Sequence, residues 1–359
     1  MTGEHSGDII GAWYAKKLLQ QNPNLTITAI GGEQLKNAGA TMYKSSAEFA
    51  ITGIVEIVKH LPFIFKSLTQ ITEYICTNDF DTVICIDYPG FNLRLVKRLK
   101  SKKPDLKIIY VAPPQLWVWG AGRLTTLKNY CDKIVVMYPF EVLWYAERGV
   151  TVSYEGSPLF ERLTPYLANN QEKEFMLALL PGSRTAEIKT LMPMFAEIIK
   201  KIIRTIPMVK IAIIRAESIA RHELEASLTS YQIPLHAVSI IEPNDKYQTL
   251  THCFAALTKP GTCTLELGIL GIPSIVLYKT SWLTYWLARM VTNIKFMALP
   301  NLFLPKPVFR ERIQSECKAK VIYQDVVELY EEFLHNKNAY DARCKKLEEL
   351  KKQFSFTSP

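Results

Sequence analysis

Short apolar runs alternate along this chain with longer stretches in which apolar residues recur at the helical period. Such alternation is typical of strands and helices that follow one another in turn, and it predicts parallel β-sheets covered by α-helices. The first half of the chain contains candidate strands at residues 26–30, 81–86, 107–111, 133–137 and 152–154. The second half contains further candidates at residues 175–180, 210–214, 253–257 and 273–277.

A polar stretch at residues 161–174 separates the two groups of strands and is interrupted by Pro165. We therefore interpret it as a linker between an N-terminal domain, residues 1–160, and a C-terminal domain, residues 175–359. The length of 359 residues agrees with two domains. The expected fold is α/β, with two Rossmann-like domains facing a cleft.

The glycine-rich turn at residues 3–8 has an unusual position. It leads into a helical stretch at residues 9–19, yet only two residues precede it. A turn of this kind normally follows a β-strand. Three explanations stay open: the chain is a fragment, its start is assigned too late, or the sheet lacks its first strand.

The composition narrows the class of protein. Hydrophobic residues make up 48% of the chain and charged residues 21%, which excludes a disordered or fibrous chain. The formal net charge of +9 indicates a partner with negative charge, either a phosphate ligand, an anionic lipid or a nucleic acid. No stripe of basic and aromatic residues and no known binding module accompanies this charge, so we expect no nucleic acid partner.

The number of cysteines and the hydropathy of the chain indicate the cellular compartment of the protein. The seven cysteines form no CxxC pair and their number is odd, which favours a reducing environment. No signal peptide is recognisable, and no apolar run approaches the roughly 18 residues of a membrane span. We expect a cytoplasmic protein with at most peripheral membrane contact. The oligomeric state stays open, and a homodimer is compatible with the sequence.

Candidate ligand-binding residues follow the strands, because ligands of open α/β sheets bind beyond the carboxyl ends of strands. Gly182, Ser183 and Arg184 stand between a candidate strand and a helix that begins near Thr185. Free N–H groups at a helix start, together with a guanidinium, suit a diphosphate. Glu187 lies in the first turn of that helix, where a carboxylate either takes part in binding or only stabilises the helix dipole.

Gly261, Thr262 and Glu266 repeat this arrangement after the candidate strand at residues 253–257. Thr262 is placed to cap the next helix, and Glu266, about one turn further on, is placed to accept both hydroxyls of a ribose. The alternative is an ordinary N-cap at Thr262, with Glu266 paired to a nearby base. The spacing alone does not decide between these two interpretations.

Asp87 directly follows the candidate strand at residues 81–86, where a rigid strand end can hold a general base. The structural alternative is an aspartate that caps the turn before Pro89. No Ser-His-Asp or HExxH arrangement is present, and the six histidines do not cluster with carboxylates. We therefore expect no catalytic metal.

Nine short motifs follow one another over nearly the whole chain. They are GEHSGD at residues 3–8, TGIVE at 52–56, DYPGFNLRL at 87–95, YVAPPQLWVW at 110–119, PFE at 139–141, GSPL at 156–159, LPGSR at 180–184, PGTCTLE at 260–266 and LPN at 299–301. In order and spacing they resemble the motifs of the lipid-A-disaccharide synthase family. The chain departs from the family's usual pattern at Gly90, Ser157 and Pro260, where an aspartate, a histidine and a serine are common.

The resemblance implies an inverting glycosyltransferase of the GT-B architecture, with an acceptor-binding N-terminal domain and a C-terminal domain that binds the UDP-sugar. The implied reaction joins UDP-2,3-diacylglucosamine (UDP-diacylglucosamine) to 2,3-diacylglucosamine 1-phosphate (lipid X) through a β-1,6 link and releases UDP. The implied location is the cytoplasmic face of the inner membrane of a Gram-negative bacterium. Since the UDP-sugar is a substrate, no cofactor and no metal is expected. Two other hypotheses stay open: another GT-B transferase with a glycolipid or polyprenyl acceptor, and an inactive nucleotide-sugar binding homologue.

The resemblance also extends the set of candidate site residues. It makes Asp87 the leading candidate for the base that takes the proton from the acceptor 6-hydroxyl, and Glu4 and Asp8 compete for this role. The further substrate-binding candidates are Gly3, Ser6, Gly7, Asn92 and Asn301.

An aromatic segment at residues 278–290 interleaves Trp282 and Trp286 with basic residues. Aromatic residues with basic flanks suit the lipid headgroup region, and the segment is too short to span a membrane, so we expect it to lie on the surface. The alternative is a core helix whose aromatic side chains pack against the second sheet. Residues 61–68 have a similar composition and are a rival membrane patch.

Overall fold

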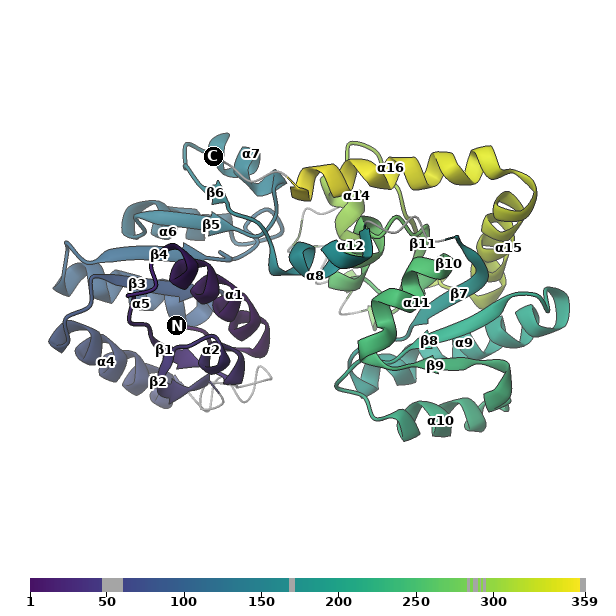
Figure 1. The fold of residues 1–359 in the computed structure, drawn as a ribbon, viewed down its shortest axis with the longest axis horizontal. Coiled ribbons are helices and arrows are strands. Elements are labelled where there is room, and N and C mark those ends of the chain that lie inside the picture. The colour runs from purple at the N-terminus through teal and green to yellow at the C-terminus, as the bar shows by residue number, and fades with distance from the viewer. Residues whose placement is uncertain are drawn as a thin grey trace. The chain divides into compact units, whose positions relative to one another are not determined.

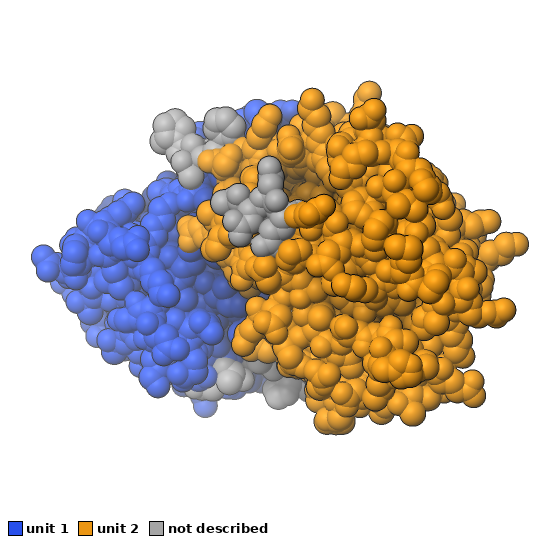
Figure 2. All heavy atoms as spheres, turned by 45° about the vertical axis from the view of Figure 1, so that its right-hand side comes forward, with its two compact units in different colours: residues 1–158, 356–359 blue, residues 159–355 orange. Residues whose placement is uncertain are grey.

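The structure is a computed structural model that describes residues 1–46, 61–167, 172–282, 285, 286, 290, 292 and 295–355. It contains two compact units, Met1–Pro158 and Leu159–Ser355, drawn in blue and orange in Figure 2. The motif at residues 52–56, residues 168–171 of the expected linker, and residues 283, 284 and 287–289 of the aromatic segment lie outside the described residues.

The first unit contains two parallel sheets (Figure 1). One sheet pairs β1 (Thr28–Gly31) with β2 (Thr41–Ser45), and the other has the order β3 (Thr82–Ile86), β4 (Lys107–Val111), β5 (Lys133–Val136) and β6 (Ser153–Tyr154). The helices are α1 (His5–Gln21), α2 (Glu33–Asn37), α4 (Leu61–Thr77), α5 (Pro89–Lys102), α6 (Leu124–Tyr130) and α7 (Phe140–Ala146). Helix α1 belongs to the cores of both sheets, because Tyr14 packs with β3, β4 and β5 while Ala12 and Ala15 pack with β1 and α2.

Met1 and Thr2 lie between these two sheets. The N–H of Thr2 donates to the carbonyl of Ile30 in β1 at 2.9 Å, and the N–H of Ile86 in β3 donates to the carbonyl of Met1 at 3.0 Å. The amine of Met1 donates to the carbonyl of Ile84 at 2.8 Å. These two residues therefore occupy the end of the strand position that normally precedes a glycine-rich turn.

The second unit contains one parallel sheet of six strands (Figure 1). Its order is β12 (Arg310–Ile313), β11 (Ser274–Tyr278), β10 (Cys253–Thr258), β7 (Glu174–Leu180), β8 (Lys210–Ile214) and β9 (Ser239–Ile241). Its helices are α8 (Pro158–Leu167), α9 (Thr185–Thr205), α10 (Arg221–Ser230), α11 (Lys246–His252), α12 (Thr262–Ile269), α14 (Leu299–Phe303), α15 (Ala319–His335) and α16 (Lys337–Ser355).

The core of the second unit is built around its central strands. All six residues of β10 are buried, as expected of a parallel strand that helices cover on both faces. Helices α9 and α15 pack against each other and contribute Phe195, Ile199 and Ile322 to this core. Helix α12 packs against α14 and α16, and a Cβ at Gly268 would lie 2.7 Å from Leu350, so glycine permits the close approach of α16.

The hydrophobic pattern predicts the bounds of β4 and β8 correctly, and the other predicted strands differ by one or two residues at one or both ends. It misses β2, β9 and β12, whose residues are exposed or only partly buried and so carry a weak apolar signal. Residues 161–167, which we assigned to the linker, form part of α8 because Leu159 and Leu163 are buried. Helix α1 begins at His5, so most of the expected turn at residues 3–8 is helical.

Candidate active site

A cavity of about 800 Å³ opens at one edge of the sheet in the second unit. The strands β7, β8 and β10 are parallel neighbours, so their carboxyl ends meet at the edge where α/β proteins bind ligands. Gly182 and Ser183 after β7, Arg215 after β8 and Lys259 after β10 line this cavity. Glu266 lines it too, so three residues predicted to bind the nucleotide sugar lie around one space.

Glu187 organises the turn after β7. Its Oε2 accepts hydrogen bonds from the N–H groups of Ser183 at 2.9 Å and Arg184 at 3.3 Å. Its Oε1 accepts from Lys259 Nζ at 2.7 Å. Burial alone would raise the pKa of Glu187, but the hydrogen bonds from Lys259 and Ser183 hold it below the ordinary value. The carboxylate therefore binds N–H groups that were predicted to bind a diphosphate.

The position of the Glu187 carboxylate also affects its neighbours Gly182 and Arg184. Gly182 has a φ of 125°, and a Cβ there would lie 2.5 Å from the carboxylate of Glu187, so the turn requires glycine. The side chain of Arg184 is 79% exposed and pairs with Glu187 at 3.1 Å. Helix α9 begins at Thr185, as predicted.

Glu266 is buried, and three groups from outside α12 bind its carboxylate. Lys246 Nζ lies 2.5 Å from Oε2, the Tyr247 hydroxyl donates to Oε1 at 2.9 Å, and Arg162 Nη2 lies 3.5 Å from Oε1. Burial would raise the pKa of Glu266, but the charge of Lys246 keeps it below the ordinary value. Sequence reasoning missed these partners, because they lie 20, 19 and 104 residues away and no motif connects them. The pairing with a base agrees with the structural alternative for Glu266.

The N-cap of α12 is Gly261, and Thr262 is the exposed first residue of the helix. The prediction of a side-chain cap at Thr262 is therefore wrong. The reason is the backbone of Gly261, whose φ of 137° lies in the region that favours glycine. The N–H and hydroxyl of Thr264 both donate to the Gly261 carbonyl, at 3.0 and 2.8 Å.

In the first unit, Asp87 and Tyr88 follow β3 with φ values of 49° and 46°, which non-glycine residues rarely adopt. Asn92 supports this turn, because its Nδ2 donates to the carbonyls of Asp87 at 2.9 Å and Ile86 at 3.3 Å. The Tyr110 hydroxyl also donates to the Asp87 carbonyl, at 2.8 Å. Asn92 is fully buried, and its side chain stabilises the backbone of the turn at Asp87.

The start of α1 lies against this turn. A Cβ at Gly3 would lie 2.3 Å from the ring of Tyr88, and a Cβ at Gly7 would lie 3.8 Å from the Cβ of Asp87. Burial raises the pKa of Asp87, and the negative charge of Glu4 adds to this shift. Glu4 is therefore close enough to Asp87 for its charge to act on the Asp87 carboxyl group.

Asp8 is buried and holds the N-terminus of α2. Its Oδ1 accepts from the N–H of Gly32 at 2.7 Å, and its Oδ2 accepts from the N–H of Gln34 at 3.0 Å. These bonds favour a structural role for Asp8, comparable to that of an N-cap. Glu4 and Ser6 are exposed.

Asn301 is buried, and both polar groups of its side chain form hydrogen bonds. Its Nδ2 donates to the Phe309 carbonyl and to Glu311 Oε1, each at 2.8 Å. Its Oδ1 accepts from the N–H groups of Val308 and Phe309, each at 2.8 Å. This network closes the loop between α14 and β12 and supports a structural role.

Glu141 is a buried acid that belongs to a family motif but was not among the predicted site residues. Its Oε1 accepts from Trp117 Nε1 at 3.0 Å, and its Oε2 accepts from the N–H of Tyr138 at 3.1 Å. Burial raises the pKa of Glu141 to about 7, although these hydrogen bonds favour the charged form. Glu141 therefore connects two of the nine motifs through Trp117.

Two surface regions expose aromatic side chains. Trp282 and Trp286 are 56% and 60% exposed. The ring centroid of Tyr285 lies 5.9 Å from that of each tryptophan. In the first unit, α4 exposes Phe63 and Phe65. The exposure of Trp282 and Trp286 argues against the alternative in which they pack in the core.

Within the described ranges, no three His, Cys, Asp or Glu side chains gather as a metal site requires. No helix in the same part of the chain combines the length and the apolar character that crossing a membrane requires.

The fold is similar to solved structures of the GT-B type. A putative UDP-N-acetylglucosamine 2-epimerase from Listeria monocytogenes has a TM-score of 0.60 at 14% identity, covering 96% of this chain and 89% of that chain. A glycosyltransferase from Rickettsia africae has a TM-score of 0.54 at 12% identity, covering 98% of this chain and 92% of that chain. The chain therefore has the GT-B architecture of two Rossmann-like domains, which confirms the expected fold class.

Sequence relatives identify the family. A family model described as lipid-A-disaccharide synthetase matches residues 1–358. The lipid-A-disaccharide synthase of Coxiella burnetii is 33% identical over 361 residues, which cover 98% of this chain and 93% of the relative. That of Geobacter metallireducens is 30% identical over 344 residues, which cover 93% and 88%. The chain belongs to the lipid-A-disaccharide synthetase family, a family of hexosyltransferases in lipid A disaccharide synthesis, so the resemblance is confirmed.

Proposed function

We propose that the chain is an inverting glycosyltransferase that joins UDP-2,3-diacylglucosamine to lipid X through a β-1,6 link and releases UDP. Family membership supports the reaction. The observation that carries the proposal is the cavity at the carboxyl ends of β7, β8 and β10. It combines glycine turns at two helix starts with basic side chains and a buried carboxylate, which suits a nucleoside diphosphate.

The UDP group is proposed to bind in this cavity through the starts of α9 and α12. Because Glu187 binds the N–H groups of Ser183 and Arg184, the diphosphate is proposed to bind at the turn after β7 mainly through the Arg184 guanidinium, with the first turn of α12 at Thr262 beside it. Lys259, which is bonded to Glu187 at 2.7 Å, adds positive charge at this turn. Glu266 accepts the ribose hydroxyls, and the charge of Lys246 beside it keeps this carboxylate ionised and ready to accept them.

The acceptor reacts through its 6-hydroxyl, which attacks the anomeric carbon of the donor. The bond from that carbon to the UDP oxygen breaks, and UDP leaves with the bonding electrons. Asp87 takes the proton of the attacking hydroxyl. Because burial raises the pKa of Asp87, its carboxylate is a stronger base than an exposed aspartate. Glu4 is the competing base.

The test is turnover by the purified protein with UDP-diacylglucosamine and lipid X, followed by mass spectrometry of the disaccharide. Formation of the disaccharide and equimolar UDP supports the proposal. Turnover with a polyprenyl phosphate or another glycolipid, but not with lipid X, supports another GT-B transferase. UDP binding in calorimetry without turnover of any acceptor supports an inactive binding protein.

Arg184→Ala tests the UDP assignment. If the guanidinium mainly stabilises departing UDP, turnover falls by about 10²-fold or more while the donor KM changes less. Arg204→Ala is the matched control, because Arg204 is exposed near the other end of α9. Unchanged turnover in the Arg184→Ala protein would refute the assignment.

Asp87→Asn tests the base, with an expected loss of about 10²-fold or more in turnover at neutral pH. Asp105→Asn is its control, since Asp105 is exposed in the turn before β4. A wild-type rate in a correctly folded Asp87→Asn protein would transfer the role to Glu4.

Lipid substrates place the proposed enzyme at a membrane surface, in peripheral contact with the cytoplasmic face of the inner membrane. The exposed rings of Trp282 and Trp286 are the proposed contact, because aromatic side chains favour the headgroup region. Phe63 and Phe65 on α4 are the rival contact.

A further inference from the structure

The loop between β4 and α6, residues 112–123, begins at the same sheet edge as Asp87. The N–H of Asp87 donates to the Val111 carbonyl at 3.0 Å, and the N–H of Ala112 donates to the Val135 carbonyl at 2.9 Å. These two bonds continue the pairing of β3, β4 and β5 beyond the carboxyl ends of the strands. The loop therefore starts beside the proposed base.

Trp117 attaches the middle of this loop to the start of α7. Its Nε1 donates to Glu141 Oε1 at 3.0 Å, and its ring meets that of Phe140 edge-on, with the ring centroids 5.2 Å apart. Because Glu141 is buried, this attachment holds the loop against the body of the first unit. Two residues further on, Trp119 is 50% exposed.

Trp119 and Arg123 form a cation–π pair at the end of the loop. The guanidinium carbon of Arg123 lies 4.2 Å from the centroid of the Trp119 ring. Gly120 between them has a φ of 75°, a conformation that favours glycine, and its turn brings the chain back toward the ring. The pair therefore holds one positive charge at the surface of the loop.

The N–H groups of the Arg123 guanidinium are available to a ligand. Among the described residues, no carboxylate lies within ion-pair distance of this guanidinium, and no hydrogen bond involves it. Stacking on an aromatic ring uses the face of a guanidinium, whereas its N–H groups point outward in its plane. This planar fork of donors matches the oxygen atoms of a phosphate.

A second arginine–tryptophan pair in the first unit is built differently. The guanidinium carbon of Arg148 lies 4.0 Å from the centroid of the Trp144 ring. Arg148 also donates to the Trp144 carbonyl at 2.8 Å and pairs with Glu147 at 3.3 Å. Its charge is thus compensated within the protein, which makes Arg148 a matched control for Arg123.

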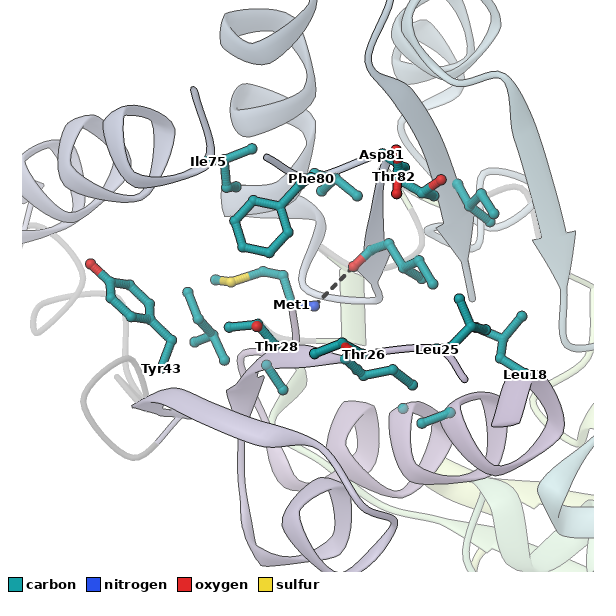
Figure 3. A pocket seen from close by; sticks show the side chains of 18 of the residues that line it. Met1, Leu18, Leu25, Thr26, Thr28, Tyr43, Ile75, Phe80, Asp81 and Thr82 are labelled. Atoms are coloured by element: carbon teal, nitrogen blue, oxygen red, sulfur yellow. Dashed lines mark hydrogen bonds between the residues drawn. The ribbon is translucent and has the colours of Figure 1, made fainter. Parts of the chain in front are cut away.

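Two other places in the first unit fit a phosphate less well. A cavity of about 670 Å³ is lined by Asp79, Asp81 and Lys107, so negative side chains outnumber positive ones there (Figure 3). Arg94 on α5 is exposed, but its guanidinium donates to the Gly90 carbonyl. Arg123 therefore offers an anion the better site.

We propose that Arg123, stacked on Trp119, binds the 1-phosphate of the acceptor lipid X. This inference rests on the proposed function, which supplies lipid X as the acceptor. The 6-hydroxyl and the 1-phosphate stand on opposite sides of one sugar ring. Asp87 after β3 and Arg123 in the loop after β4, from neighbouring strands, act on these two ends of the acceptor. Arg123 is thereby a residue that determines specificity for a phosphorylated acceptor.

The first test compares lipid X with the same 2,3-diacylglucosamine without its phosphate. The wild type should have the higher kcat/KM for lipid X. Arg123→Ala should lower this value by about 10- to 100-fold, mainly through KM, and should leave the unphosphorylated acceptor and the donor KM unchanged. Arg123→Gln, which keeps a side chain of similar length without the charge, should behave likewise. Arg148→Ala should keep the full preference for lipid X.

Four results would overturn the proposal. The first is a full preference for lipid X in a folded Arg123→Ala or Arg123→Gln protein. The second is loss of this preference in Arg94→Ala only. The third is a raised donor KM in Arg123→Ala, which would assign Arg123 to UDP. The fourth is weaker flotation of Arg123→Ala with anionic vesicles at unchanged acceptor preference, which would assign it to a membrane lipid.

The second test measures acceptor binding without the donor, by calorimetry in a nonionic detergent. The wild type should bind lipid X more tightly than the unphosphorylated acceptor by about tenfold or more, and Arg123→Ala should bind both equally. Such binding without formation of the disaccharide would support the inference and refute the proposed function. Disaccharide formation by a wild type that binds both acceptors equally would support the function and overturn the inference.

Discussion

Replacing Glu141 by glutamine should remove a pH dependence from the stability of the protein. Burial raises the pKa of Glu141 to about 7, from an ordinary value of 4.5. Between these two values the folded protein keeps a proton on Glu141 that the unfolded chain has lost. At about 1.4 kcal/mol per pH unit, the separation corresponds to about 3 kcal/mol of stability.

The sign follows from proton uptake. The folded state binds more protons than the unfolded state in this window, so the free energy of unfolding falls as the pH rises. The contribution of Glu141 is fully present below about pH 4.5 and is lost above about pH 7. Its amide replacement does not titrate, so the Glu141→Gln protein should lack this fall. The glutamine keeps one acceptor oxygen for the two donors, Trp117 Nε1 and the Tyr138 N–H, so one hydrogen bond is lost at a cost of about 1 kcal/mol at every pH. The slope of stability against pH is therefore the test.

The assay is urea unfolding, followed by circular dichroism, at several values between about pH 5 and pH 8. Over this range the wild type should lose about 2 to 3 kcal/mol more than the Glu141→Gln protein. Glu147→Gln is the matched control, because Glu147 is exposed at the end of the same helix. It should follow the wild type. Parallel profiles for the wild type and the Glu141→Gln protein would refute the reasoning.

The hydrogen-bond network of Asn301 and the exposed rings of Trp282 and Trp286 allow two more tests. Asn301→Ala should lower the free energy of unfolding by about 3 kcal/mol or more in urea unfolding, because it leaves the N–H groups of Val308 and Phe309 without their acceptor. A loss below about 1 kcal/mol would contradict the structural role. Trp282→Ser combined with Trp286→Ser should reduce flotation with anionic vesicles at unchanged Tm, since both rings are exposed. Equal flotation would exclude this segment as the main anchor and favour α4.

Features that depend on neighbouring residues along the chain could be predicted from the amino-acid sequence. The bounds of β4 and β8 could be predicted because each strand is a short apolar run between polar residues, buried on both faces. The helix start at Thr185 could be predicted from the glycine turn before it. The order of the motifs was sufficient to identify the family. All of these signals lie within a few residues of one another or in a linear order.

Contacts between side chains that are distant in the sequence became apparent only in the folded protein. Arg310 and Arg312 make β12 too polar to be predicted as a strand, yet Asp325 of α15 binds both guanidinium groups at 2.6 and 2.7 Å. The carboxylate of Glu266 is bound by Lys246 and Tyr247, which the spacing of its motif does not indicate. Asp8, a candidate base by position, proved to bind the backbone of α2 through hydrogen bonds 24 and 26 residues away. Whether a segment forms a strand or a helix depends largely on the preferences of adjacent residues. The partner of a buried charge depends on how distant elements pack, and a local sequence pattern contains no information about that packing.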